Sequence, residues 1–152
     1  MKRINWKKAE KGQSLVEFSL GIVFLLIIVS GLIDLGRLYF THVALEDAVG
    51  EAALYLSINP HCKYGPDKGG PAECANPNNA DYRAHNSGGQ EVDWAKATFA
   101  FDVPEPYGVG ETVKASVSYS YPLLTAIIPK IVGINPITLT SSASQTVITE
   151  LQ

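Results

Sequence analysis

Residues 18–33 read FSLGIVFLLIIVSGLI, a run without one charged side chain. If Glu17, Asp34 and Arg37 are tolerated as interruptions, the apolar stretch extends from Leu15 to Phe40. At about 1.5 Å of rise per residue, a helix over the uncharged run spans roughly 24 Å, and the longer stretch exceeds the ~30 Å hydrocarbon core of a bilayer. The alternative is a buried helix of a soluble domain, but a chain of 152 residues is too small to surround such a helix on all sides. We therefore predict a transmembrane helix.

The charges around this helix predict its orientation. In the first twelve residues, five Lys and Arg side chains against Glu10 give +4, so the rest of the chain, at a total of −3, carries −7. Because basic residues stay on the cytoplasmic side, we expect a single-pass protein of the inner (cytoplasmic) membrane, with the N-terminus in the cytoplasm and everything after about Phe40 outside. The remaining basic residues are scattered, which argues against nucleic acid as a partner. The expected partner of the apolar helix is membrane lipid.

A secretory signal peptide also has a basic start and an apolar run, but it is cleaved after the run at small residues. Val29-Ser30-Gly31 matches that A-x-A pattern poorly, and the helical pattern continues beyond it. The junction before the run is more distinctive: it reads KGQSLVEF over residues 11–18, with Gly12 directly before the apolar stretch and Glu17 five residues beyond Gly12.

This junction resembles the type IV prepilin cleavage site. Over residues 12–56 the chain resembles the TadE-like minor pilins and pseudopilins of the tight-adherence pilus system. The resemblance rests on three motifs in order: GQSLVEF at 12–18, GLIDLGR at 31–37, and ALEDA at 44–48 followed by Ala52. The resemblance implies that a prepilin peptidase cuts after Gly12, leaving Gln13 as the new N-terminus and Glu17 as the fifth residue. It also implies inner-membrane assembly machinery and other pilin subunits as partners.

Three acidic or basic positions in the helix are candidates for subunit packing. A carboxylate at the edge of the hydrocarbon is costly, so Glu17 is expected to meet a cation such as the α-amino group of a neighbouring subunit, or else to be solvated by lipid headgroups. Asp34 and Arg37, three residues apart, lie on one helix face at the outer interface. They form either a local ion pair or a contact with a partner subunit.

The helix is expected to continue past the membrane as an amphipathic segment, to about residue 57, and to end before Pro60. Ala44, Ala48 and Ala52 repeat every four residues and form a small-residue strip that permits close approach of another element. The strip either seats the external head on its own helix or lines a contact between subunits.

The segment 59–90 is dense in Pro, Gly and Asn, and we predict a loop there. Cys62 and Cys74 lie on the oxidising side of the membrane, where a disulfide is the expected state. With His61 and His85 the two cysteines could be imagined as a zinc set, but the spacing fits no compact zinc motif. We expect no metal and no cofactor.

Three strands are predicted in the remainder, at 98–103, 112–121 and 137–148, and the alternation of apolar and polar residues is strongest in the second. An antiparallel sheet on the outer part of the long helix makes the fold α+β and type IV pilin-like. The apolar segment Leu123–Val132 either folds over the sheet or forms a contact surface.

The domain organisation is then a basic leader at 1–12, a transmembrane and amphipathic helix at 13–57 and an external β-rich domain at 58–152. No P-loop, nucleophile elbow, zinc-protease or dinucleotide motif occurs, so we predict a structural protein without catalytic residues. Two functions stay open: a processed pilin-like subunit of a fibre, and an unprocessed single-pass anchor that carries a periplasmic or extracellular binding domain.

Overall fold

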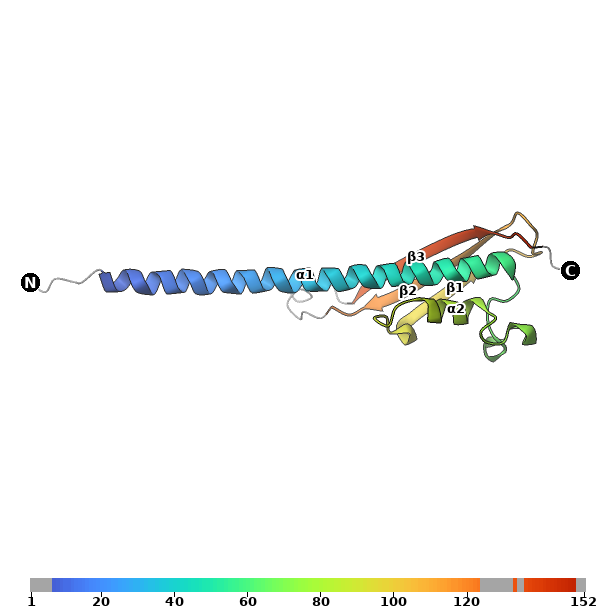
Figure 1. The fold of residues 1–152 in the computed structure, drawn as a ribbon, viewed down its shortest axis with the longest axis horizontal. Helices are drawn as coiled ribbons and strands as arrows, with labels where there is room; N and C mark the ends of the chain where they lie inside the picture. Colours follow the sequence, from blue (N-terminus) through green and yellow to red (C-terminus); the bar gives the residue numbers. More distant parts are fainter. Residues whose placement is uncertain (1–6, 124–132, 134–135, 150–152) are drawn as a thin grey trace, which may run out of the picture.

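The computed structural model describes residues 7–123, 133 and 136–149, and one long helix dominates it. This helix, α1 (Lys7–Ile58), projects its first half away from a small head that packs along its second half (Figure 1). The head contains the helix α2 (Ala80–Ser87) and the strands β1 (Ala97–Asp102), β2 (Thr112–Tyr121) and β3 (Ile137–Thr146). The α+β, pilin-like fold predicted from the sequence is confirmed.

Helix α1 is continuous because its 52 residues include no proline. It begins at Lys7, ahead of the 13–57 segment expected from the sequence, so the helix runs through Gly12 without a break. At the other end it stops at Ile58, directly before Asn59 and Pro60, and the amide of Ile148 donates a hydrogen bond to the carbonyl oxygen of Ser57. The last turn is thereby tied to the chain that follows β3.

The three strands form an antiparallel sheet in the order β1-β2-β3. Ala97 pairs with Tyr119 at one end of the β1-β2 ladder, and Tyr121 pairs with Ile137 in the β2-β3 ladder. The bounds of β2 are those predicted, and its apolar face is buried as the alternation indicates: Val113, Ala115, Val117, Tyr119 and Tyr121. β3 ends at Thr146, two residues earlier than predicted. It alternates from Ile137 to Ala143, with Leu139 as its buried residue.

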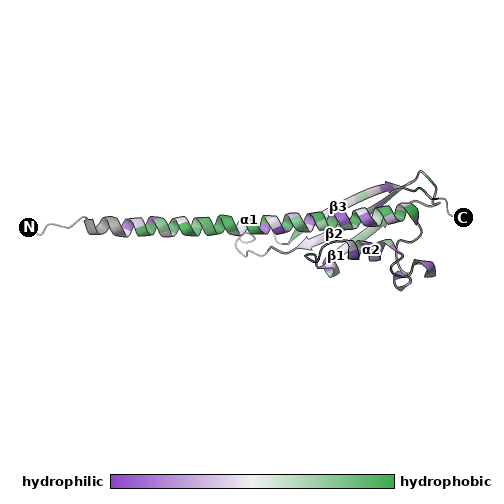
Figure 2. Ribbon diagram, in the orientation of Figure 1, coloured by the Kyte–Doolittle hydropathy of each residue, from purple (hydrophilic) through white to green (hydrophobic). Residues whose placement is uncertain are grey.

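The core lies between this sheet face and the second half of α1. Leu45, Val49 and Leu56 are its largest helix residues, and each is at most 1% exposed. Hydrophobic residues dominate the first half of α1, whereas hydrophilic and hydrophobic residues alternate along its second half (Figure 2). The sheet therefore covers one side of the second half of α1, and α2 also packs against this helix.

The expected loop at 59–90 is not loop throughout, because α2 and two 3₁₀ turns, Pro66–Lys68 and Ala72–Cys74, occur within it. α2 begins where Asn79 caps it, with the side-chain oxygen of Asn79 accepting a hydrogen bond from the amide of Tyr82 at 2.7 Å. The Pro and Gly content that predicted a loop fits the connections on either side of this helix. Of the segment Leu123–Val132, only Leu123 lies within the described residues, and it packs against the core.

Candidate functional site

The first half of α1 is an apolar surface that the described part of the chain leaves uncovered. Leu15, Leu26 and Phe40 are 69%, 60% and 65% exposed, and none of the most apolar 18-residue window is buried. By length and composition the helix can cross a membrane, as a signal sequence near an N-terminus also could. A core helix of a soluble domain would be buried, and in the described residues this window is not. Water is a poor solvent for so large an apolar surface, so lipid or other apolar helices are the environment it favours.

Gly12, Gln13 and Glu17 lie within about one and a half turns of this exposed helix. The side-chain amide Nε2 of Gln13 donates a hydrogen bond to Oε1 of Glu17 at 3.1 Å. Within residues 12–123, 133 and 136–149, no cation forms a salt bridge with Glu17. A side chain at Gly12 would meet no atom within 4 Å. Nothing in the described fold therefore requires glycine at position 12.

Asp34 and Arg37 occupy different environments although they share a helix face. Asp34 is 2% exposed and takes part in an interaction within the fold, whereas Arg37 is exposed. Tyr121, at the end of β2, lies close to both: burial raises the pKa of its hydroxyl, Arg37 lowers that pKa, and Asp34 raises it further. The head thus reaches down α1 to the level of these two charges.

The small-residue strip is taken by the chain's own head. Ala44, Ala48 and Ala52 are 6%, 0% and 0% exposed and belong to the core between α1 and the sheet. Their short side chains let the backbones of helix and strands approach closely. In the single chain the strip seats the head on its own helix, which is the first of the two alternatives. A role of these three alanines between subunits stays a prediction.

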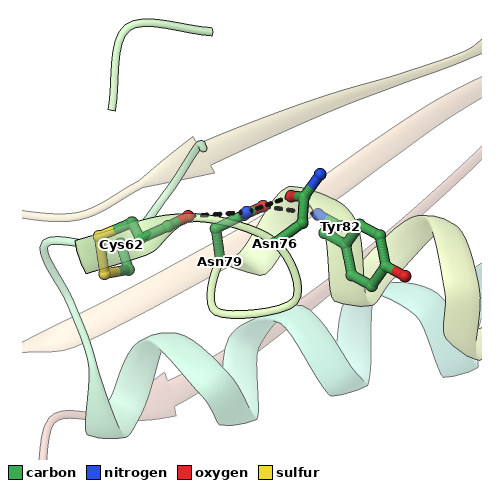
Figure 3. The surroundings of a disulfide bond; sticks show 5 residues. Cys62, Asn76, Asn79 and Tyr82 are labelled. Carbon is green, nitrogen blue, oxygen red and sulfur yellow. Dashed lines mark hydrogen bonds between the residues drawn. A yellow bond between two sulfur atoms is a disulfide. The ribbon is translucent and has the colours of Figure 1, made fainter. Parts of the chain in front are cut away.

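Cys62 and Cys74 form a disulfide in the connection between α1 and α2 (Figure 3). The buried Asn79 joins this disulfide to α2, because its Nδ2 donates to the carbonyl oxygen of Cys74 at 3.0 Å while its Oδ1 caps the helix. His61 is near both sulfurs, but disulfide sulfurs are not thiolate ligands. His85 instead packs on Phe99, with ring centroids 4.8 Å apart. The imagined zinc set is therefore not assembled.

A contact that sequence reasoning missed holds α2 to α1. Nη1 of Arg83 lies 3.0 Å from Oε1 of Glu51, and its guanidinium lies 4.5 Å from the centre of the Tyr55 ring. Both charged side chains are more than a third exposed, so solvent screens the pair and its role is orientation more than stability. The N-cap residue Asn79 was the one available signal of a helix here.

Comparison with known proteins adds a family match to this geometry. The family model described as TadE-like protein matches residues 12–54. Over these residues the chain is TadE-like. The TadE-like stretch begins at Gly12, includes Glu17 and the whole exposed half of α1, and ends within the buried half. No curated protein matches the chain. No solved structure matches it either.

The TadE-like match agrees with the fold. A chain that is TadE-like over residues 12–54 and has an exposed apolar helix there is consistent with a pilin-like protein of a Tad pilus. Proteins of the TadE-like family are generally structural rather than enzymatic. The long apolar helix suggests a membrane anchor or a signal, and the family implies a location in the cell envelope or a pilus.

Proposed function

We propose that this chain is a pilin-like structural subunit of a Tad-type pilus. It is inserted in the inner membrane with its N-terminus in the cytoplasm and its head outside, and it packs through α1 into or at the base of a fibre. The observation that carries the proposal is the bare apolar half of α1, which starts at Gly12 and carries Glu17 within a TadE-like stretch. The basic leader supports the orientation.

The second half of α1 also offers a surface for packing. Val43, Asp47, Gly50, Leu54 and Ile58 are spaced three or four residues apart, so they share one helix face. Leu54 and Ile58 are 50% and 43% exposed, and a side chain at Gly50 would meet no atom within 4 Å. This face lies away from the alanine strip, so neighbouring helices in a fibre reach it without displacing the head.

In this proposal Gly12 serves processing and Glu17 serves assembly. A prepilin peptidase, the first partner, removes residues 1–12 and creates an α-amino group on Gln13. That amino group pairs with Glu17 of a neighbouring subunit, which neutralises a carboxylate that is costly at the edge of the hydrocarbon. Arg37 stays exposed at the outer boundary, whereas Asp34 acts within its own chain.

The experiment is an intact-mass and N-terminal-sequence measurement on protein isolated from membranes. Loss of the first twelve residues is expected, and Gly12→Leu is expected to retain them because a bulky side chain blocks the peptidase. Glu17→Ala is expected to be processed but to be missing from sheared filaments. Glu46→Ala, a matched control at an exposed acidic position of the same helix, is expected to behave as the wild type.

Retention of Met1 in the wild type would instead support the unprocessed anchor with an external binding domain. Normal assembly of Glu17→Ala into filaments would remove the pairing role of that carboxylate. A full chain that stays soluble and monomeric in water without detergent would overturn both functions.

A further inference from the structure

A hollow lies between α1 and the segment that joins α2 to β1. Its volume is about 320 Å³, and it is lined by Arg37, Phe40 and Thr41 of α1 and by Glu91. Thr41 is 2% exposed, so it lies on the buried side of the hollow, while Phe40 is 65% exposed at its rim. The hollow therefore has one cation, one carboxylate, a hydroxyl and an aromatic ring around one space.

The position of Arg37 along α1 puts this hollow at the outer boundary of a bilayer. Twenty residues separate Glu17 from Arg37, and at about 1.5 Å of rise per residue they span roughly 30 Å, the thickness of the hydrocarbon core. Tyr39 and Phe40, with ring centroids 5.9 Å apart, follow directly and are exposed, as expected of aromatic residues at a membrane interface. The hollow opens where lipid headgroups lie.

Glu91 is held at the hollow by its neighbours rather than by a cation. Val92 is 4% exposed, and a side chain at Gly88 would come within 3.1 Å of the carbonyl oxygen of Ala44, so the backbone on both sides of Glu91 is anchored in the fold. The nearby Lys96 is already paired with Asp93 at 2.7 Å. Across residues 12–123, 133 and 136–149, neither Glu91 nor Arg37 forms a salt bridge.

We propose that this hollow binds the headgroup of one amine-bearing phospholipid in the outer leaflet. Arg37 donates hydrogen bonds to phosphate oxygens, since a guanidinium fork matches that group, and the carboxylate of Glu91 accepts hydrogen bonds from the ammonium group. The charges of Arg37 and Glu91 cancel, and a zwitterionic headgroup likewise has no net charge. An anionic headgroup without an amine leaves Glu91 facing negative charge, and a choline headgroup offers the carboxylate no N–H donor.

The inference rests on the membrane-spanning part of the proposed function, and its test uses the full-length protein in detergent. Native mass spectrometry measures binding of phosphatidylethanolamine, phosphatidylcholine and phosphatidylglycerol. We expect phosphatidylethanolamine to bind about tenfold more tightly than the other two, as one charge-assisted hydrogen-bonded group permits. Soluble phosphoethanolamine tests the other source of the same chemistry, and we expect it to bind more weakly because it lacks the acyl chains.

Two variants separate the two charges. Arg37→Gln is expected to weaken the binding of all three lipids. Glu91→Gln is expected to abolish the preference for phosphatidylethanolamine over phosphatidylcholine, while binding of the phosphate group is retained. Glu111→Gln, at an exposed carboxylate in the turn before β2, is the matched control and keeps the preference. An intact Cys62–Cys74 disulfide and an unchanged urea midpoint show that each variant is folded.

Equal binding of the three lipids, or a preference that survives Glu91→Gln, overturns the inference. A phosphoethanolamine affinity equal to that of the lipid also overturns it, because the ligand is then a free solute. A chain that fails to enter bilayers at all rejects the proposed function. A chain that inserts and assembles without a preference for amine-bearing lipid rejects the headgroup site alone.

Discussion

The two halves of α1 belong to one continuous helix but have different surfaces. Between Leu15 and Ile33 its large apolar side chains are exposed on every face, whereas from Asp34 to Ile58 one face carries buried residues that the head covers. Small residues at Ala44, Ala48 and Ala52 fit the buried half, and bulky residues fill the exposed half. Among the residues that the structure describes, the chain thus covers the second half only.

This difference in burial indicates which half of α1 depends on other molecules. The second half has a core of its own, so its stability is a property of the single chain. The first half offers apolar surface that is favourable only in lipid or against other helices. Perturbations of the first half should therefore change insertion and assembly, while perturbations of the second half should change the stability of the head.

The largest effect is expected from charges in the exposed half. The double variant Phe24→Lys and Ile27→Lys puts two cations near the middle of the apolar run, at about 3 kcal/mol each by insertion scales. We expect most of this protein to remain outside the membrane fraction after carbonate extraction. Its matched control is Leu54→Lys with Ile58→Lys, on the exposed face of the second half, which is expected to insert normally and to lose assembly. Equal insertion of the two double variants would refute the division of α1.

The second largest effect concerns the head alone. Replacing both cysteines with Ser opens a loop whose ends are 12 residues apart, and loop-closure entropy gives such a crosslink about 3 kcal/mol of stability. We expect a lower urea midpoint for loss of near-UV circular dichroism, with insertion unchanged. Dithiothreitol treatment of the wild type is the control and should reproduce the shift. A variant that unfolds at the wild-type midpoint would show that the disulfide adds nothing to the head.

A third prediction concerns the alanine strip. Ala48→Leu forces three extra carbons into a position that is 0% exposed, and overpacking of this kind costs about 1–3 kcal/mol. The thermal midpoint of the head is expected to fall, while membrane insertion is retained. Ala100→Leu, on the exposed face of β1, is the control and should leave the midpoint within error. An unchanged midpoint for Ala48→Leu would mean that the head can separate from α1.

Much of this architecture could be predicted from local pattern. The length and apolar character of residues 15–40 predicted the long helix, and strict alternation predicted the bounds and buried face of β2, because each signal is repeated along the chain. The disulfide followed from the compartment and from there being two cysteines. The alanine strip stayed ambiguous, since small residues suit a strand of the same chain and a helix of another equally well.

What could not be predicted depends on contacts between distant segments. An eight-residue helix such as α2 is too short to be stable alone, and its contact between Arg83 and Glu51 of α1 has no sequence signature. In the same way, nothing near Glu91 in the sequence indicates that it faces Arg37 across a hollow. Such juxtapositions require the folded chain.

The smallest effect is expected where the two halves of α1 meet. The hydroxyl of Tyr121 is buried without a hydrogen-bond partner in the described part of the chain, so Tyr121→Phe removes an unsatisfied group and should leave stability at pH 7 unchanged or higher by about 1 kcal/mol or less. Burial raises the pKa of Tyr121 above its ordinary value of 10.0, which means that the folded state favours the neutral hydroxyl.

The contribution of that raised pKa is fully present below about pH 10 and is lost as the pH rises through the folded-state value. Urea denaturation between pH 8 and pH 11 is therefore expected to show a steeper loss of stability for the wild type than for Tyr121→Phe, within the limits of about 1 kcal/mol typical of one buried hydroxyl. Tyr107→Phe, which removes the 2.9 Å hydrogen bond from the tyrosine hydroxyl to Glu105, is the comparison variant and is expected to lose stability already at pH 7. Parallel pH profiles for wild type and Tyr121→Phe would show that water reaches this tyrosine, and hence that the head is not closed where the two halves of α1 meet.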